Sequence, residues 1–398
     1  MTGDPLSAKQ DRLSHSMTER LYYQDCYLRE FTARVIETDG NRVYLDRTAF
    51  YPTSGGQPFD LGSLGGVAVR EVIDEEDRIG HVMDAPLAAA EVVGVIDWPR
   101  RYGHMQQHTG QHLLSAVLEE LFAIRTVSFH LGTDVSTIDV EAPLLTAEQL
   151  ERVEERCAEI IAQARPVQIT FEDASTTLEL RKASERTGTL RIVSIENLDR
   201  SACGGSHVRS TAEIGMVLTG KTEKIRGITR LEFVCGNRAL RRARADYRLL
   251  AAIGRALSVP PEQTPELLAG LIERNKSLEK TTQRLATELA RREGKELYLA
   301  ATPDADGIRR LIQRGPIDDA MRARAQAFVT GEKAVFLAIC DQPPSLLLAA
   351  SADSGIHAGD RVKAAVAAAH GRGGGNAQLG QGSVPDVAAL TGAEALLR

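Results

Sequence analysis

The sequence has few cysteines and no pairing pattern among them. Five cysteines are scattered through 398 residues, and none stands in a Cys-x-x-Cys pair. An odd, dispersed set in a long chain argues against the disulfide framework that holds small secreted domains together. The folded state must therefore rely on hydrophobic cores, for which a composition of 43% hydrophobic and 26% charged residues is ordinary.

Long apolar runs are also missing. No stretch approaches the roughly 20 apolar residues that a membrane helix needs. The first 20 residues are polar and contain no apolar segment of signal-peptide length. We therefore expect a cytoplasmic protein that makes no membrane contact.

An excess of positive charge is absent too, because the net charge is −6. This counts against nucleic-acid binding over the whole surface, so any RNA contact must use a local basic patch. Residues 237–248, NRALRRARADYR, carry five arginines and offer such a patch. The alternative for this segment is a solvated helix face.

The length suits two or three domains, and the pattern predicts an α+β multidomain chain. Over residues 20–100, short β-branched runs separated by glycine-rich turns predict a small antiparallel β-barrel. Residues 101–250 mix helical and strand patterns and predict a two-layer α+β domain. Within it, Thr146 followed by Gln149 predicts a helix that begins with a capping box.

The last two regions are a predicted helical arm and a predicted small α/β domain. In residues 251–299, Leu271, Leu278 and Leu285 recur at seven-residue intervals among charged residues. This spacing indicates a helix that pairs with a partner helix, and the alternative is a surface helix docked on its own domain. Residues 300–398 alternate helical and strand-like segments and contain a glycine-rich loop near their end.

Two histidines in a predicted helix point to metal binding. His108 and His112 are four residues apart, so their imidazoles lie on one helix face. His104 lies one turn earlier on the same face. The spacing alone does not decide between the pair 104/108 and the pair 108/112.

A second pair of candidate ligands follows about ninety residues later. Cys203 and His207 flank Gly204 and Gly205, which let the backbone bend tightly while both side chains point the same way. A thiolate combined with imidazoles is a ligand set suited to zinc. Four protein ligands would close a structural site, whereas a catalytic zinc needs an open or displaceable position, so both roles stay open.

Four segments resemble parts of alanyl-tRNA synthetases, around and within their editing domain, and of their free-standing AlaX relatives. HTGQHLL at 108–114 resembles the family's HxxxH helix, and CGGSH at 203–207 resembles its CxGxH element. FYPTSGGQPFDLG at 50–62 resembles the glycine-rich segment of the preceding barrel. GRGGGNAQLGQG at 371–382 resembles the end of the DHH-associated domain. Because no aminoacylation domain precedes residue 31, the chain resembles the long, free-standing type, which would not charge tRNA.

The resemblance implies a zinc-binding editing domain and assigns a role to individual residues. Its zinc ligands would be His108, His112, Cys203 and His207, with His104 outside this set. The glycine-rich loop would line the substrate pocket through Thr53, Ser54, Gly55 and Gly56, with Gln57 as a candidate catalytic residue. Backbone N–H groups at 55–57 would stabilise an oxyanion. The alternative for this loop is a plain turn.

One segment departs from the family pattern. Residues 128–132 read SFHLG where many family members carry a glutamine. His130 would take the place of that glutamine and orient or deprotonate a water, as histidine side chains do near neutral pH. The alternative is an ordinary strand residue.

The implied substrate is tRNA(Ala) mischarged with serine or glycine, and the implied reaction is hydrolysis of its ester bond. A site that hydrogen-bonds the serine hydroxyl discriminates strongly against alanine, because alanine leaves the polar group unpaired. The tRNA body would contact a basic helix and backbone amides of the C-terminal DHH-associated, RNA-binding domain, namely Arg238, Arg241, Arg242, Gly373, Gly374 and Gly375. We also expect a homodimer through the helical arm or the C-terminal domain.

Two other functions compete with this prediction. One is a non-catalytic RNA-binding protein whose fold is stabilised by a structural zinc ion. The other is a metal-dependent phosphoesterase, suggested by the DHH-associated domain. The sequence disfavours the phosphoesterase, because it contains neither a DHH triad nor an aspartate-rich metal cluster.

Overall fold

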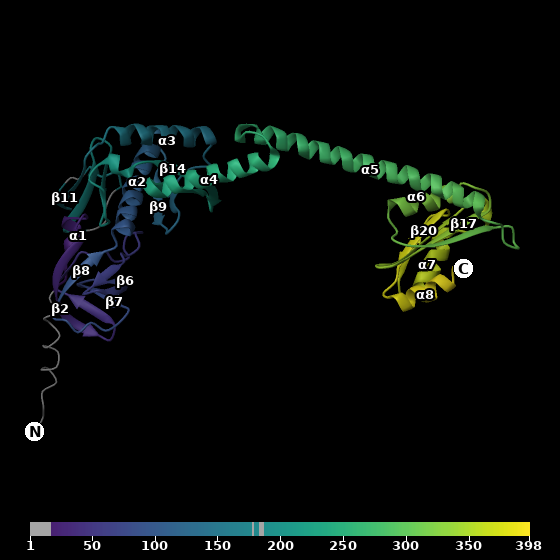
Figure 1. Ribbon diagram of the computed structural model, residues 1–398, viewed down its shortest axis with the longest axis horizontal. Coiled ribbons are helices and arrows are strands. Elements are labelled where there is room, and N and C mark those ends of the chain that lie inside the picture. Colours follow the sequence, from purple (N-terminus) through teal and green to yellow (C-terminus); the bar gives the residue numbers. More distant parts are fainter. Residues whose placement is uncertain (1–16, 177–178, 183–186) are drawn as a thin grey trace, which may run out of the picture. The chain divides into compact units, whose positions relative to one another are not determined.

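The computed structural model of the chain describes residues 17–176, 179–182 and 187–398. It contains both helices and sheets, which confirms the prediction of a mixed α+β multidomain protein. The chain divides into two compact units, Met1–Ala252 and Ile253–Arg398 (Figure 1). Within the described residues, no helix is both long and apolar enough to span a membrane.

Six antiparallel strands near the N-terminus form a closed barrel in the order β2-β3-β7-β6-β5-β8. Alternate side chains point inward, as the strictly alternating exposure along β8 shows. Phe50, Leu64 and Ile79 lie in its core. The strands are β2 (Glu30–Asp39), β3 (Arg42–Leu45), β5 (Gly62–Leu64), β6 (Val67–Glu75), β7 (Arg78–Met83) and β8 (Glu91–Ile96). Beside it, β1 (Glu19–Arg20) leads into α1 (Leu21–Gln24) and pairs in parallel with β4 (Arg47–Thr48).

The central helix of the first unit is α2 (Trp98–Phe122). It begins after Asp97, whose carboxylate accepts a hydrogen bond from the backbone of Arg100 at 3.2 Å. It ends at Ala123, which has a left-handed conformation. A buried ion pair between Arg101 and Asp60 joins the start of this helix to the barrel loop, with Nε and Oδ2 2.9 Å apart.

Two further sheets and a second helix surround α2. The four-stranded sheet has the order β14-β15-β10-β9 and the three-stranded sheet the order β11-β12-β13. The helix α3 (Ala147–Ala162) begins with the predicted capping box between Thr146 and Gln149. The strands are β9 (Thr126–Leu131), β10 (Ser136–Val140), β11 (Val167–Asp173), β12 (Thr189–Ile195), β13 (Asp199–Ala202), β14 (Val217–Ile225) and β15 (Ile228–Cys235). A short 3-10 helix, η2 (Thr211–Ile214), precedes β14.

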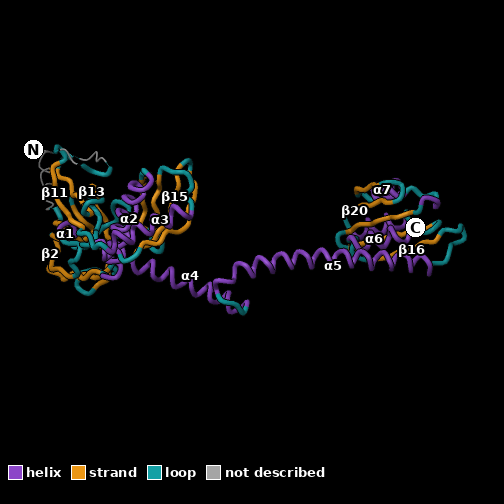
Figure 2. The backbone as a smooth tube through the Cα atoms, turned by 90° about the horizontal axis from the view of Figure 1, so that it is seen from above, coloured by secondary structure: helices purple, strands orange, loops and turns teal. Residues whose placement is uncertain are grey.

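Helices occupy the region predicted as an arm. The helix α4 (Gly236–Leu257) is followed by η3 (Pro261–Gln263) and by α5 (Thr264–Ala300), which Figure 2 shows as one unbroken helix. Leu271, Leu278 and Leu285 are all exposed on α5. The C-terminal part of α5 packs on α6, and pairing with a second chain stays a prediction.

The second unit contains a five-stranded sheet in the order β16-β17-β18-β20-β19. Alternate residues of β17 face opposite sides: Phe336 packs with α5 and α6, whereas Leu337 packs with α7 and α8. Helices therefore cover both faces of the sheet. The elements are β16 (Arg309–Arg314), α6 (Asp319–Phe328), β17 (Ala334–Asp341), β18 (Pro344–Ala350), η4 (Ala352–Ser354), α7 (Ala358–Ala368), β19 (Arg372–Gly375), β20 (Leu379–Ser383) and α8 (Val387–Ala395).

The glycine-rich segment near the C-terminus is not the loop that the sequence suggested. Gly373, Gly374 and Gly375 lie in β19, the edge strand of the sheet, and pair with β20. A Cβ atom at Gly380 would meet the backbone of Ala358 at 2.5 Å. Glycine therefore allows the helix α7 to lie directly against this hairpin.

Candidate metal centre

The helix α2 brings His108 and His112 to the same buried face. Their ring centroids are 5.5 Å apart, as the four-residue spacing requires. His104 is buried one turn earlier and does not belong to the group of converging ligand atoms. Burial lowers the pKa of His104 to about 3. The structure therefore brings the pair 108/112, rather than 104/108, to the candidate centre.

Cys203 and His207 approach this face from the segment that follows β13. The Cys203 sulfur lies 3.4 Å from Nε2 of His108 and 3.3 Å from Nε2 of His207. A Cβ atom at Gly205 would meet the His108 ring at 2.0 Å, so only glycine permits this close approach. Ligand atoms of all four predicted residues lie within 4.8 Å of one another.

Each histidine of this cluster is held through its Nδ1 atom. Nδ1 of His108 lies 2.9 Å from Oε1 of Gln57, and Nδ1 of His112 lies 2.7 Å from Oδ2 of Asp199. Nδ1 of His207 lies 3.1 Å from Oγ1 of Thr109. Partners of this kind fix the ring orientation and tautomer of metal-binding histidines, and they leave the Nε2 atoms for an ion.

Asp199 is part of a buried charged network behind His112. Its carboxylate also accepts hydrogen bonds from Arg181 at 2.5 Å and from the Ser201 hydroxyl at 3.1 Å. Burial disfavours charge on both partners, but their mutual contact holds the pKa of Asp199 at about 2 and raises that of His112 to about 9. The network thus keeps the carboxylate of Asp199 negatively charged beside the candidate ligand His112.

The electrostatics of the cluster favour a thiolate. Burial alone would raise the pKa of the Cys203 thiol, but the neighbouring imidazoles, that of His108 above all, hold it well below its usual range. Burial lowers the pKa of His207 to about 3, which keeps that imidazole neutral. One thiolate and three imidazoles form the donor set that tetrahedral zinc prefers.

A cavity of about 380 Å³ opens beside the cluster. Two of the candidate ligands, His112 and Cys203, lie in its wall, so a molecule in the cavity reaches the centre directly. The other lining residues come from the barrel loop, α2, β9, the segment between β11 and β12, and β13: Gly55, Gln111, Thr126, Val127, Ser128, Phe129, Arg181, Lys182, Ser201 and Ala202.

The barrel loop contacts the centre mainly through one residue. Gln57 is fully buried, and its amide is engaged by His108 and Ser206 rather than directed at the cavity. Its backbone N–H donates to Ser54 at 2.9 Å. Gly55 lines the cavity, whereas Thr53 and Ser54 are exposed outside its wall. Gly56 packs so closely on Phe129 that a Cβ atom there would lie 2.9 Å from the ring.

The structure does not bring His130 to the cluster. Phe129 packs against His108, with ring centroids 5.1 Å apart. Successive side chains of a strand point to opposite faces, so His130 points away from the centre. It is exposed and is not part of the cavity wall.

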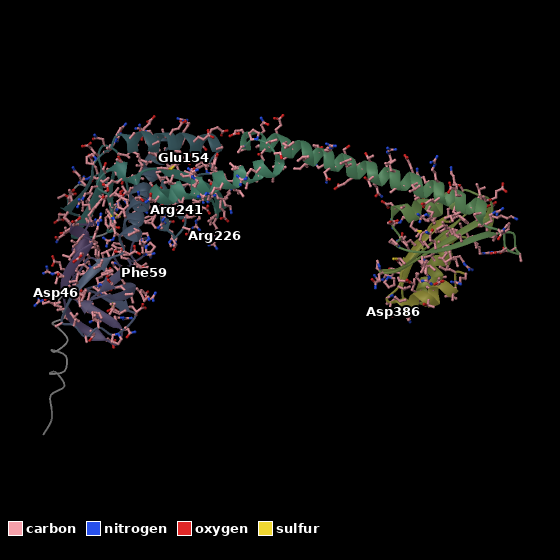
Figure 3. All side chains as sticks on the ribbon, in the orientation of Figure 1. Asp46, Phe59, Glu154, Arg226, Arg241 and Asp386 are labelled. Carbon is pink, nitrogen blue, oxygen red and sulfur yellow. The ribbon has the colours of Figure 1, made fainter. Side chains whose placement is uncertain are left out.

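The predicted tRNA contacts lie on two different elements. Arg238, Arg241 and Arg242 belong to α4, and Figure 3 labels Arg241 on it. Arg238 is partly buried and donates to the carbonyl of Gly132 at 2.7 Å. Arg242 pairs with Asp246 on the same helix. Gly373, Gly374 and Gly375 belong to the edge strand β19 in the second unit.

No sequence pattern marks the side chains that support the ligands. Thr109 and Ser206 lie inside the two motifs, but their spacing indicates no supporting role, and Asp199 lies outside both motifs with a partner distant in the chain. Gln111 was overlooked as well, although it stands inside the HxxxH motif. Its position beside His112 was the one available hint.

The chain is similar in sequence to several known proteins. Residues 190–232 match the family model described as the threonyl and alanyl tRNA synthetase second additional domain. The alanyl-tRNA editing protein AlaX-L of Pyrococcus horikoshii is 35% identical, over 71% of this chain and 74% of that protein. The alanyl-tRNA editing protein Aarsd1-A of Xenopus laevis is 31% identical, over 84% of this chain and 86% of that protein.

A longer relative matches as well. An alanine–tRNA ligase of Pyrococcus abyssi is 30% identical, over 93% of this chain but only 42% of the ligase. The editing proteins, in contrast, are matched over most of their own length. The chain therefore belongs to the family of alanyl-tRNA editing proteins.

Proposed function

We propose that this chain is an aminoacyl-tRNA deacylase that hydrolyses mischarged tRNA(Ala) at a zinc site. Editing of alanyl-tRNA is the activity in the names of its relatives. Serine would be the chief mischarged amino acid, with glycine as a second. The ligands of the zinc would be His108, His112, Cys203 and His207.

The observation that carries the proposal is the cavity that reaches the ligand cluster. A structural zinc site is closed and has no need of a cavity at its ligands. Here His112 and Cys203 form part of the wall of a space large enough for an aminoacyl group. This arrangement favours catalysis over the alternative of a zinc-stapled RNA-binding protein without activity.

The zinc ion and the residues of the chain would have different roles in the hydrolysis. A zinc ion held by these four side chains would polarise the ester carbonyl as a Lewis acid. Gln57, Asp199 and Thr109 hold the three imidazole rings in place. The backbone N–H groups of Gly55 and Gly56 are the candidates for stabilising negative charge on the ester oxygen, since that of Gln57 already donates to Ser54.

Binding of the tRNA body would use surfaces outside the cavity. Arg241 and Arg242 are exposed on α4 and would contact phosphates, with Arg238 beside them. Backbone groups of Gly373, Gly374 and Gly375 at the sheet edge would provide a second contact. Residues 20–100 would serve as the barrel domain, 101–250 as the editing domain, 251–299 as the arm that joins two copies, and 300–398 as the RNA-binding domain.

Hydrolysis assays with and without metal test the proposal. Purified protein is incubated with Ser-tRNA(Ala), Gly-tRNA(Ala) and Ala-tRNA(Ala), before chelation, after chelation and after zinc is restored. We expect rapid loss of serine, spared alanine, and activity that disappears and returns with zinc. If the protein binds zinc stoichiometrically and hydrolyses none of the three substrates, the catalytic proposal is wrong.

The variant His108→Ala separates the two roles of the metal. If the variant keeps the wild-type unfolding transition and loses deacylation, the site is catalytic. If the variant unfolds, and the wild-type protein also unfolds when its zinc is removed, the site is structural.

A further inference from the structure

A glutamine inside the HxxxH motif lies at the boundary between the metal centre and the cavity. Gln111 is on α2, next to the candidate ligand His112, and only 3% of its surface is exposed. It forms part of the wall of the cavity, together with His112 and Cys203. It therefore lies where the aminoacyl group of a substrate would be held.

One end of the Gln111 amide is fixed and the other has no partner. Nε2 donates to Oγ of Ser115 at 2.9 Å, and Oγ1 of Thr126 donates to the same oxygen at 2.7 Å. Oε1 of Gln111 is buried without a hydrogen-bond partner among the residues that the structure describes. Buried amide oxygens in folded proteins are almost always paired, so a donor from a bound molecule is expected here.

The other side chains of the cavity wall do not supply this donor. The Ser128 hydroxyl donates to Asp139 at 2.8 Å, and the Ser201 hydroxyl donates to Asp199. Arg181 is paired with Asp199, and Lys182 donates to the carbonyl of Val127 at 3.1 Å. Each of these groups has another partner and none of them donates to Oε1 of Gln111, which leaves this acceptor for the ligand.

The aminoacyl group of a mischarged tRNA has two polar groups that could donate to this oxygen. One is the α-amino group, which serine, glycine and alanine share. The other is the side-chain hydroxyl, which serine alone carries. Arg181 is paired with Asp199, but Lys182 remains in the wall. A zinc ion at the centre would outweigh the charge of the Cys203 thiolate, so a further positive charge in the cavity is disfavoured. A neutral hydroxyl matches a neutral amide oxygen better.

We propose that Gln111 is a specificity-determining residue whose Oε1 accepts the hydroxyl of a serine attached to tRNA. This inference rests on the proposed deacylase function. Alanine and glycine would both leave the buried oxygen unpaired, so Gln111 favours the serine substrate over both. Ser115 and Thr126 act on it by holding the amide in one orientation.

The variant Gln111→Met tests the proposal, since methionine keeps a similar length without the amide. The kcat/KM for Ser-tRNA(Ala) should fall at least tenfold, while that for Gly-tRNA(Ala) stays within about threefold. Equal losses for both substrates would overturn the proposal, because they would assign the oxygen to the shared amino group. Unchanged kinetics for both would overturn it as well. Zinc content equal to that of the wild type serves as the control for the metal site.

A second variant and a binding assay keep the test independent of folding and catalysis. Ser115→Ala removes the anchor of the amide together with the acceptor of the Thr126 hydroxyl, and we expect a smaller loss that is again confined to the serine substrate. If the wild type hydrolyses no substrate, the proposed function fails, yet Gln111 is still tested by calorimetry with adenosine carrying a 3′-amide-linked serine or alanine. The wild type should bind the serine compound more tightly and Gln111→Met should bind both alike; equal binding by the wild type overturns the proposal.

Discussion

Oε1 of Gln57 lies 2.9 Å from Nδ1 of His108, although the two residues are 51 positions apart in the chain. The same oxygen accepts a hydrogen bond from the backbone of Ser206 at 3.1 Å, and Nε2 of Gln57 donates to the Ser206 hydroxyl at 2.8 Å. One amide of the barrel loop thus contacts both halves of the candidate metal centre. The loop therefore holds His108 and Ser206 in place through Gln57 and connects the barrel to the candidate metal centre.

Replacing this amide should weaken metal binding. We expect Gln57→Ala to lower zinc affinity by about 10–100-fold, because His108 loses the partner that orients its ring. Titration against a competing chelator measures the change. Thr53→Ala in the exposed part of the same loop is the matched control and should bind zinc like the wild type. Identical zinc affinities for Gln57→Ala and the wild type would contradict the role of this contact.

His130 should be dispensable for the chemistry. Its side chain points away from the centre, so we expect His130→Ala to keep kcat/KM for Ser-tRNA(Ala) within about twofold. Its neighbour Phe129, which packs on the His108 ring, provides the comparison. Phe129→Ala should reduce kcat/KM much more, because it removes a wall of the cavity. A large loss of kcat/KM in His130→Ala would contradict this prediction and would again make His130 a candidate catalytic residue.

Stability should fall in mild acid because of a histidine in the barrel. His81 is completely buried, with Nε2 2.9 Å from Thr48 Oγ1 and Nδ1 3.1 Å from the Val43 carbonyl. Burial lowers its pKa to about 4, from about 6.5 in the unfolded chain. Between these values only the unfolded chain binds the proton, so the free energy of unfolding decreases as pH falls from 6.5 towards 4.

The loss due to His81 should reach about 3 kcal/mol at the lower end of this range. Urea unfolding at pH 7 and pH 4.5 measures it. His81→Gln lacks the titrating group, so its unfolding free energy should change less between the two pH values than that of the wild type. Parallel pH profiles for the two proteins would rule out His81 as the source.

The arginines of α4 should contribute to tRNA affinity through charge. We expect Arg241→Ala to weaken binding of charged and uncharged tRNA alike and to reduce the slope of log affinity against log salt by about 1. Filter binding over a range of salt concentrations measures both quantities. Arg70, which pairs with Asp84 on the barrel, provides a control of equal charge change. The prediction fails if both variants show the wild-type salt slope.

Several features of this protein follow from the sequence by itself. Two histidines four residues apart share a helix face whatever surrounds the helix, and glycines between Cys203 and His207 permit the bend that both side chains need. The capping box at Thr146 likewise depends on residues three positions apart. These features are local, which is why their spacing predicts them.

The tertiary structure alone decided how the centre is supported and which side chains face it. The partners of His108, His112 and His207 come from residues 51, 87 and 98 positions away. The direction of His130 depends on which face of β9 packs against α2, and the glycine-rich segment became a strand because β20 and α7 lie against it. Such contacts arise when distant segments pack together, and no local spacing of residues encodes them.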